Sequence, residues 1–262
     1  MADGLIYSEN CMDVMDCMGE EVDLTLTSPP YDSMRKYSGY EFDARAVIRK
    51  LLDVTKPGGA CVWVVGDKVE NGAVTLTSFK QGLMFQEAGW TVTDVMAYHK
   101  RNAFFKRPGA YVKAFEYMFV CSKGRPKTFN PLVVPCKRAG HTRTTPTTSR
   151  RPDGGMRIKP PHTTKPTKMR TNVWSYSSGF GNTTRDRYAY DHPAMFPEKL
   201  AEDHIRSWSN PGDLVFDPMC GSGTTLKMAK LLGRRWTGCD VSARYAEIAR
   251  RRTAEACQKK LL

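Results

Sequence analysis

The sequence predicts an α/β fold with a mostly parallel central sheet that is interrupted by a basic insertion. Two stretches, residues 1–122 and 191–262, alternate short apolar or β-branched runs with runs of helical spacing, a pattern typical of parallel sheets covered by helices. The stretch between them is rich in Arg, Lys, Thr, Pro and Gly and has little periodicity. A length of 262 residues with 40% hydrophobic side chains suits one large core with an insertion.

The first stretch predicts five strands and two helices. Helical spacing over Asp43–Thr55 and Thr75–Ala88 predicts the helices. Residues 56–59 (Lys-Pro-Gly-Gly) and Gly89 are expected to end them, because Gly and Pro interrupt helices. The strands are the short apolar or β-branched runs Leu5–Tyr7, Val22–Thr27, Ala60–Val65, Thr91–Tyr98 and Phe115–Cys121.

The last stretch returns to the same alternation. Its strands are short and apolar, and each is followed by a run of helical spacing, as expected for a parallel sheet. The predicted elements are, in order, a helix over Phe196–Trp208, a strand over Asp213–Asp217, a helix over Thr224–Leu232, a strand over Arg235–Asp240 and a helix over Ala243–Cys257.

The excess positive charge lies in one segment. Residues 123–187 hold 15 Lys or Arg and two acids, a net charge of +13 that equals the formal charge of the whole chain. Such a composition does not build a core of its own, so we expect long loops or partial order without a partner. The segment favours contact with nucleic-acid phosphates, and a solvated linker is the alternative. The candidates for DNA contact are Arg150, Arg151, Arg157, Lys159 and Arg170.

Several classes of protein are not expected from this sequence. The longest uninterrupted apolar run, Ala60–Val65, is far shorter than the roughly 20 residues of a membrane span. Residues 1–10 have neither the basic nor the apolar part of a secretion signal. The eight cysteines are scattered without a Cys-x-x-Cys pair, so we expect neither a structural zinc nor a disulfide framework. A reduced cytoplasmic location fits best.

A glycine-rich turn follows one predicted strand. Residues 214–225 read Leu-Val-Phe-Asp-Pro-Met-Cys-Gly-Ser-Gly-Thr-Thr, so a buried strand ends in the acid Asp217 and leads through two glycines into a helix. This arrangement suits a nucleoside at the carboxyl edge of a sheet. The next strand ends in Asp240, whose carboxylate is placed to accept hydrogen bonds from ribose hydroxyls.

The details of the turn select among nucleotide ligands. A phosphate-binding P-loop needs Gly-Lys-Ser/Thr, but the sequence has Gly-Thr-Thr at residues 223–225. A dinucleotide fingerprint needs a third glycine, but that position is Leu226. An acid before the turn and no phosphate-binding lysine favour S-adenosylmethionine, which carries adenosine without a phosphate. A purely structural glycine turn is the alternative.

A second turn, Ser28-Pro29-Pro30-Tyr31, follows the predicted strand Val22–Thr27. Two prolines fix the backbone and donate no N–H, so the carbonyl oxygens stay available. These oxygens and the Ser28 hydroxyl can accept hydrogen bonds from an exocyclic amine while Tyr31 stacks on the base. Such bonds pull the amine toward sp³ geometry, so its lone pair can attack a methyl sulfonium directly. An ordinary rigid turn is the alternative.

Together, and in this order, the two turns make the chain resemble the amino-directed DNA methyltransferases of the permuted, β-class type. The resemblance implies a Rossmann-like S-adenosylmethionine-dependent fold with a mostly parallel seven-stranded sheet and no required metal. It divides the chain into a catalytic half (1–122), a basic target-recognition region (123–190) and a cofactor-binding half (191–262). Residues 192–200 look like the family segment that packs beside the cofactor.

The resemblance also assigns residues to sites. Ser28, Pro29, Pro30 and Tyr31 would hold the target amine of a base flipped out of the duplex. Lys100 and Asn102 would help to clamp that base, while the basic residues of the middle region would contact the phosphates and base edges of the DNA. Asn10 stands where the family usually has an Asp near the adenine. The implied cofactor-binding residues are Asn10, Thr27, Phe196, Asp217, Cys220, Gly221, Ser222, Gly223, Thr224 and Asp240.

The Ser variant of this turn accompanies cytosine N4 methylation in the family, so we predict a site-specific cytosine-N4 DNA methyltransferase. An N6-adenine enzyme and a non-catalytic DNA-binding module with the same fold are the alternatives. Double-stranded DNA is the expected partner, and the resemblance adds a second copy of the chain and a cognate restriction endonuclease as candidates. We expect a cytoplasmic, nucleoid-associated protein of prokaryotic or phage origin with a role in restriction-modification.

Overall fold

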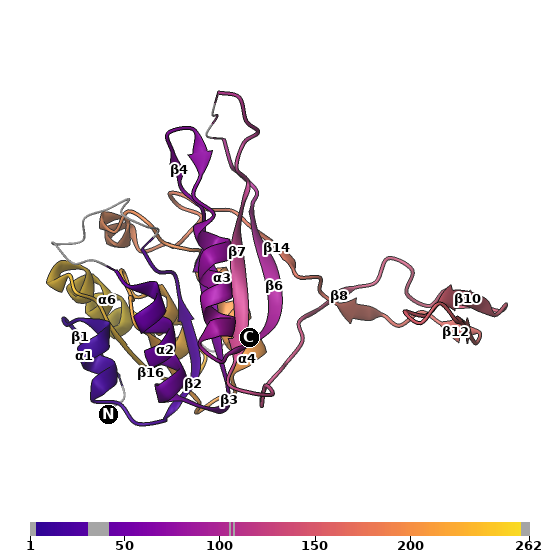
Figure 1. Ribbon diagram of the computed structural model, residues 1–262, viewed down its shortest axis with the longest axis horizontal. Helices are drawn as coiled ribbons and strands as arrows, with labels where there is room; N and C mark the ends of the chain where they lie inside the picture. The colour runs from indigo at the N-terminus through magenta and orange to yellow at the C-terminus, as the bar shows by residue number, and fades with distance from the viewer. Residues whose placement is uncertain (1–3, 31–41, 105, 107, 258–262) are drawn as a thin grey trace. The chain divides into compact units, whose positions relative to one another are not determined.

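The structure of the protein is a computed structural model that describes residues 4–30, 42–104, 106 and 108–257 (Figure 1). Two compact units make up the chain. The core unit comprises residues 1–130 and 172–262, and the hairpin unit comprises residues 131–171. The core unit holds the α/β sheet that the sequence predicts.

The sheet of the core unit is mostly parallel and has eight strands in the order β1-β16-β15-β2-β3-β7-β6-β14. Every neighbouring pair is parallel except the two that involve β7, which runs against β3 and β6. This confirms the predicted α/β fold. The strands are β1 (Leu5–Tyr7), β2 (Val22–Thr27), β3 (Thr55–Val65), β6 (Thr91–Lys100), β7 (Phe115–Ser122), β14 (Val173–Tyr176), β15 (Leu214–Asp217) and β16 (Arg235–Cys239).

The sheet has one strand more than the seven expected. The additional strand, β14, pairs in parallel with β6, although its residues lie in the region predicted as a basic insertion. Its Trp174 and Tyr176 side chains are buried. The Tyr176 hydroxyl also donates a hydrogen bond of 2.7 Å to Asp203 Oδ2. Burial of two aromatic rings therefore brings this segment into the core unit, where composition alone predicts a loop.

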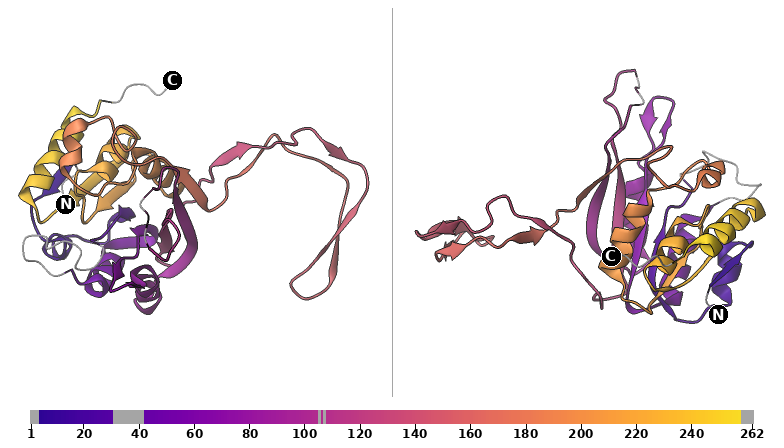
Figure 2. Two further views of the ribbon diagram at one scale, coloured as in Figure 1. Left: turned by 90° about the horizontal axis from the view of Figure 1, so that it is seen from above. Right: turned by 180° about the vertical axis from the view of Figure 1, so that it is seen from behind.

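Helices cover both faces of the sheet. In Figure 2 the indigo-to-violet helices α1–α3 lie on one face and the orange-to-yellow helices α4–α6 on the other. Within the described residues, none of them has the length and apolar character that a membrane span requires. The helices are α1 (Cys11–Asp16), α2 (Ala44–Val54), α3 (Thr77–Glu87), α4 (Glu198–Trp208), α5 (Thr224–Leu231), α6 (Ala243–Glu255) and the short 3₁₀ helix η2 (Arg187–Asp191).

Several helix boundaries differ by one or two residues from the sequence-based expectation; α3 begins at Thr77 rather than Thr75, and α6 ends at Glu255 rather than Cys257. Helix α4 begins at Glu198 rather than Phe196, because Pro197 is its N-cap and a residue before proline avoids helical backbone angles. Residues 56–59 do not form a separate stop after α2. They lie within β3, which begins at Thr55 immediately after the helix ends.

Non-local pairing explains why residues 56–59 join the strand. Thr55 pairs with Val22 and Ala60 with Leu24, so β3 bulges between these two points. Gly58 has a φ of +80°, and a Cβ atom there would lie 2.8 Å from Lys127 Cβ. The Gly58 N–H donates to the Lys123 carbonyl at 2.8 Å. The glycine thus permits a close backbone contact within β3, and it does not end the helix.

The hairpin unit consists of three successive antiparallel pairs rather than the expected long loops. They are β8 (Val133–Pro135) with β13 (Thr167–Met169), β9 (Thr142–Arg143) with β12 (His162–Thr163), and β10 (Thr147–Arg150) with β11 (Met156–Lys159). β-branched threonines favour extended backbone, and a two-stranded ladder satisfies its own hydrogen bonds without a core. The unit is shorter than the predicted 123–190 region, since residues 123–130 and 172–190 belong to the core unit.

The parallel arrangement places the two conspicuous turns at one edge of the sheet. β1, β16, β15, β2 and β3 run in the same direction, and two reversals through β7 give β6 and β14 that direction as well. Their carboxyl ends therefore share one edge, which in open α/β sheets is where ligands bind. A small hairpin, β4 (Val69–Glu70) with β5 (Ala73–Val74), follows β3.

Candidate active site

The two turns meet at adjacent strands. β15, which ends in Asp217, pairs directly with β2, which ends in Thr27. The Thr27 hydroxyl donates to Asp217 Oδ1 at 2.7 Å, across 190 residues of sequence. The Thr225 hydroxyl of α5 donates to the Leu26 carbonyl at 3.0 Å. The backbone before Ser28 and the backbone around the glycine turn are thus joined by two buried hydrogen bonds.

Asp217 is a buried carboxylic acid with few compensating partners. Only 3% of the residue is exposed. The pKa of Asp217 is raised to about 6: burial and the nearby Asp240 carboxylate raise it, while hydrogen bonds from the Thr27 hydroxyl and the Met219 N–H and the nearby Thr225 hydroxyl lower it. A positively charged ligand beside Asp217 would stabilise its ionised form, so this position suits a cation.

Asp240 holds the other side of the glycine turn. Its Oδ2 accepts the Gly221 N–H at 2.9 Å, and its Oδ1 accepts the Ser242 N–H at the start of α6, also at 2.9 Å. Burial raises the pKa of Asp240, and these two backbone hydrogen bonds lower it. Each carboxylate oxygen has further lone-pair capacity, so Asp240 can also accept hydrogen bonds from hydroxyl groups of a ligand.

The glycine turn requires glycine at two positions. Gly221 and Gly223 have φ angles of +49° and +78°, which residues other than glycine rarely adopt. A Cβ atom on Gly221 would lie 2.7 Å from His192 Nε2, and one on Gly223 would lie 2.7 Å from Ala249 Cβ. The turn therefore lies closely against residue 192 on one side and α6 on the other.

Three other predicted cofactor-binding residues lie in different segments of the core unit. Cys220 is buried, and its N–H donates to the Cys239 carbonyl at 2.9 Å. Asn10 is the N-cap of α1, where its Oδ1 accepts the Met12 N–H at 2.9 Å. Phe196 is half-buried in the segment just before α4. β1, which precedes Asn10, ends at the same sheet edge as β16, which precedes Asp240.

The predicted amine site is described in part. Pro29 is buried, while Ser28 and Pro30 are half-buried immediately after the end of β2. Tyr31 lies outside the described residues. Because β2 is the direct neighbour of β15, the Ser28–Pro30 backbone leaves the sheet beside the glycine turn. This is the adjacency that a transfer between two bound groups needs.

Lys100 and Asn102 occupy the end of β6 and the turn after it, at the same sheet edge. The Lys100 ammonium forms an ion pair with Glu116 and lies 5.6 Å from the centre of the Tyr98 ring. Asn102 bonds the backbone of Ser178, whose carbonyl accepts from Nδ2 at 2.5 Å and whose N–H donates to Oδ1 at 3.0 Å. Both side chains thus have structural partners besides any role at a bound base.

The basic candidates of the hairpin unit do not share one face. In the β10–β11 ladder, Arg157 pairs with Ser149 and Lys159 with Thr147, so these four side chains lie on one face. Arg150 pairs with Met156 and lies on the opposite face, together with Ile158. Four of the candidates are exposed and one is half-buried: Arg150, Arg151, Arg157, Lys159 and, half-buried, Arg170.

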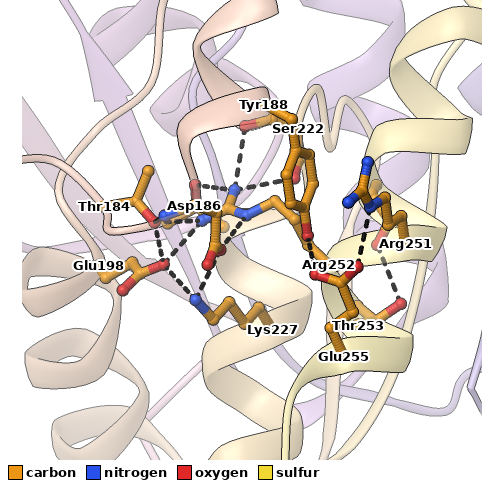
Figure 3. A network of polar contacts seen from close by, with 12 residues as sticks. Thr184, Asp186, Tyr188, Glu198, Ser222, Lys227, Arg251, Arg252, Thr253 and Glu255 are labelled. Carbon is orange, nitrogen blue, oxygen red and sulfur yellow. Dashed lines mark hydrogen bonds and ion pairs between the residues drawn. The ribbon is translucent and has the colours of Figure 1, made fainter. Parts of the chain in front are cut away.

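One buried polar network was not anticipated from the sequence. Arg252 of α6 has no exposed side-chain surface and lies behind the glycine turn, in contact with residues from three other segments (Figure 3). Residues 250–252 are three consecutive arginines, which alone suggest a solvated helix face. The spacing Ala246, Ala249, Thr253 marks the buried face of α6, and Arg252 belongs to that face. That spacing is the signal that could have identified it.

Comparison with known proteins finds a matching family and similar chains. A protein-family model described as DNA methylase (N6_N4_Mtase) matches residues 22–251. The orphan methyltransferase M.BamHII of Bacillus amyloliquefaciens is 45% identical over 240 residues, which cover 88% of each chain.

In the part of the chain that the structure describes, no group of three or more His, Cys, Asp or Glu side chains is arranged to hold a metal ion.

Two solved structures have the same fold. The PvuII DNA methyltransferase (cytosine-N4-specific) superposes with a TM-score of 0.71 at 20% identity, covering 96% of this chain and 86% of that one. The M1.HpyAVI–SAM complex superposes with a TM-score of 0.61 at 20% identity, covering 94% and 97%. At this identity the likeness establishes the fold, and the site has to be argued from its own residues.

Proposed function

Because this chain belongs to the N6_N4_Mtase family of DNA methylases, we propose that it transfers a methyl group from S-adenosylmethionine to the exocyclic N4 amine of a cytosine in double-stranded DNA. The observation that carries the proposal is the hydrogen bond between Thr27 and Asp217. It joins the strand that leads to Ser28-Pro29-Pro30 with the strand that leads to the glycine turn. A bound cofactor and a target base would then meet at one point.

The residues around the glycine turn fit the cofactor. Two glycines that exclude a Cβ atom form a close cradle, and the buried carboxylates Asp217 and Asp240 flank it. When bound, S-adenosylmethionine supplies an activated methyl group on a positively charged sulfur. Asp217 would face the charged methionine part and Asp240 the ribose. The other residues that we assign to cofactor binding are Asn10, Thr27, Phe196, Cys220, Gly221, Ser222, Gly223 and Thr224.

The Ser28-Pro29-Pro30-Tyr31 turn would activate the amine. The Ser28 hydroxyl and the Pro29 carbonyl would accept the two N–H groups of the amine, so that its lone pair is no longer shared with the ring and points at the methyl group. Tyr31 would stack on the flipped base. Positioning and electrostatics perform the step, and no covalent enzyme intermediate is needed.

The DNA would be held by basic residues outside the turn. We assign this role to region 123–190, which includes the hairpin unit, and to Lys100 and Asn102 at the end of β6. Exposed Arg and Lys side chains on a two-stranded ribbon suit phosphates and the major groove, which admits such a ribbon. The residues of the hairpin unit assigned to DNA are Arg150, Arg151, Arg157, Lys159 and Arg170.

The choice of base rests on Ser28. A serine at the head of this turn supports cytosine N4, while the name of the matching family covers both N4 and N6 amines. Adenine N6 is therefore the second candidate. The second chain copy, the restriction endonuclease partner and the cytoplasmic, nucleoid-associated location stay predictions from the resemblance.

Product analysis tests the proposal directly. The protein is incubated with unmethylated genomic DNA and S-adenosylmethionine, the DNA is digested to nucleosides, and the products are identified by chromatography and mass spectrometry. N4-methylcytosine is the expected product. N6-methyladenine would show that the target base is adenine instead of cytosine, with the same proposed mechanism. Absence of both, with the cofactor bound in calorimetry, would instead indicate a different substrate class or the non-catalytic DNA-binding module.

A further inference from the structure

Arg252 is a buried cation at a junction of three segments. Its side chain is fully buried, and removing such a charge from water costs several kcal/mol unless it is paired and hydrogen-bonded. Each of its three guanidinium nitrogens donates to a partner, and Figure 3 shows the side chain at the centre of this network. The five N–H groups of a planar guanidinium can donate to more partners, spread over a wider range, than the three N–H groups of a lysine ammonium.

One side of the Arg252 guanidinium group contacts the glycine turn. Arg252 Nη1 donates to the Ser222 carbonyl at 2.8 Å, and it lies 3.1 Å from both the Ser222 and the Thr224 hydroxyl oxygens. Ser222 stands between Gly221 and Gly223, whose backbones are free to adopt many conformations. Fixing the Ser222 carbonyl toward the interior therefore selects one conformation of the whole turn.

The other side of the guanidinium group contacts the chain that returns from the hairpin unit. Arg252 Nε donates to Asp186 Oδ2 at 2.9 Å, and Nη2 donates to Glu198 Oε1 at 2.7 Å and lies 3.3 Å from the Thr184 hydroxyl. These three partners bracket residues 184–198. The same stretch contains His192, whose ring lies against Gly221.

Lys227 of α5 completes the charge balance, and its side chain, unlike that of Arg252, does not contact the turn. Its Nζ donates to Asp186 Oδ2 and to Glu198 Oε1, both at 2.7 Å. Two cations thus face two carboxylates, and each cation touches both. The two cations differ in one respect that can be tested. Among the side chains of the described residues, only that of Arg252 links this pair of carboxylates to Ser222 by hydrogen bonds.

We propose that Arg252 is a positioning residue for the cofactor: its guanidinium fixes the Ser222 carbonyl and locks the glycine turn to residues 184–198 before any ligand binds. The inference rests on the proposed function and adds a residue that touches neither cofactor nor base. A turn held in its binding conformation binds more tightly, because the ligand does not have to order it. The effect belongs to cofactor affinity, and the transfer step itself does not use Arg252.

Two charge-matched double variants of the full chain test the proposal. Arg252→Met with Glu198→Gln removes one cation and one carboxylate and frees the Ser222 carbonyl. Lys227→Met with Glu198→Gln removes the same charges and leaves the Ser222 contact. We expect the first pair to raise the Kd for S-adenosylhomocysteine and the KM for S-adenosylmethionine by roughly tenfold, the loss of one charge-assisted hydrogen bond, while kcat at saturating cofactor stays within about twofold.

The second pair is expected to leave the Kd within about twofold of the wild type, at a similar melting temperature to the first. Equal Kd values for the two pairs would overturn the proposal and make Arg252 a stability residue only. If either double variant does not fold, Arg252→Lys keeps the charge but loses the guanidinium group, and an unchanged Kd there would overturn it as well. A wild-type protein that binds no S-adenosylhomocysteine would instead overturn the proposed function.

Discussion

The glycine turn and the hairpin unit are held in opposite ways. Residues 217–224 of the turn are closely packed, with two carboxylates, a buried arginine and two sterically required glycines around them. In the hairpin unit, residues 131–171, no side chain is buried and the strands are held mainly by their own ladders. The difference indicates that the protein itself sets the cofactor geometry, while contact with DNA would set that of the hairpin.

The sharpest test of this contrast lies at the amine site beside the turn. Ser28→Ala should lower kcat by about 100-fold or more, the usual cost of removing one positioned polar group at a reacting centre. The Kd for S-adenosylhomocysteine should stay within about twofold, because in the proposed arrangement Ser28 would contact the base and not the cofactor. Single-turnover methylation and calorimetry measure the two quantities. A matching loss of cofactor binding would contradict this division of labour.

A smaller effect is expected at the ribose position. Asp240→Ala should raise the Kd for S-adenosylhomocysteine by roughly tenfold or more, since it removes a charged hydrogen-bond acceptor and frees the Gly221 N–H. Asp213→Ala is the control for the loss of a carboxylate. Asp213 lies in an exposed turn outside the site, where its side chain accepts the Asn210 N–H. Calorimetry at one salt concentration compares the two variants, and an unchanged affinity for Asp240→Ala would reject its ribose role.

The raised pKa of Asp217 predicts a pH-dependent affinity. With a pKa of about 6, the buried carboxyl takes up a proton below that pH and no longer attracts a cation. The Kd for S-adenosylmethionine should therefore rise as pH falls below 6, by up to about tenfold per unit. Asp217→Asn should bind weakly at pH 8 and show a flatter profile, with the rest of the slope due to Asp240.

The sign for stability is opposite to that for binding. Since the pKa of Asp217 in the folded protein lies above its ordinary value of 3.8, this group favours folding at low pH, and that contribution is lost as pH rises through 6. Thermal unfolding at each pH separates the two effects. A Kd that stays constant from pH 8 to pH 5 in a folded protein would place the cation elsewhere.

The smallest expected effects come from single faces of the hairpin unit. Arg157→Ala with Lys159→Ala clears one face of the β10–β11 ladder and should weaken DNA binding several-fold, lowering the slope of log affinity against log salt by about 2. Arg150→Ala removes the candidate cation of the opposite face and should lower the slope by about 1, half as much. Binding isotherms at several salt concentrations measure both slopes. A slope equal to that of the wild type in either variant would show that the face it alters does not contact DNA.

Local patterns were sufficient for most of the elements of the core unit. The strand ending in Asp217, the helix from Thr224 and the strand leading to Ser28 are all where periodicity and turn residues predict them. Both turns were also recognisable without a structure. They are short motifs whose glycines and prolines act through their own backbone angles, so neighbouring residues alone reveal them.

Features that depend on distant partners needed the tertiary structure. Sequence separates Thr27 from Asp217 by 190 residues, and only strand order makes them neighbours. β14 becomes an eighth strand because the Trp174 and Tyr176 rings are buried. Residues 56–59 join β3 because Thr55 and Ala60, on either side of them, pair with Val22 and Leu24. Arg252 resembles a solvated charge until Asp186 and Glu198 are seen beside it. Element type is encoded by local spacing, whereas register and the pairing of buried charge arise only when remote segments pack.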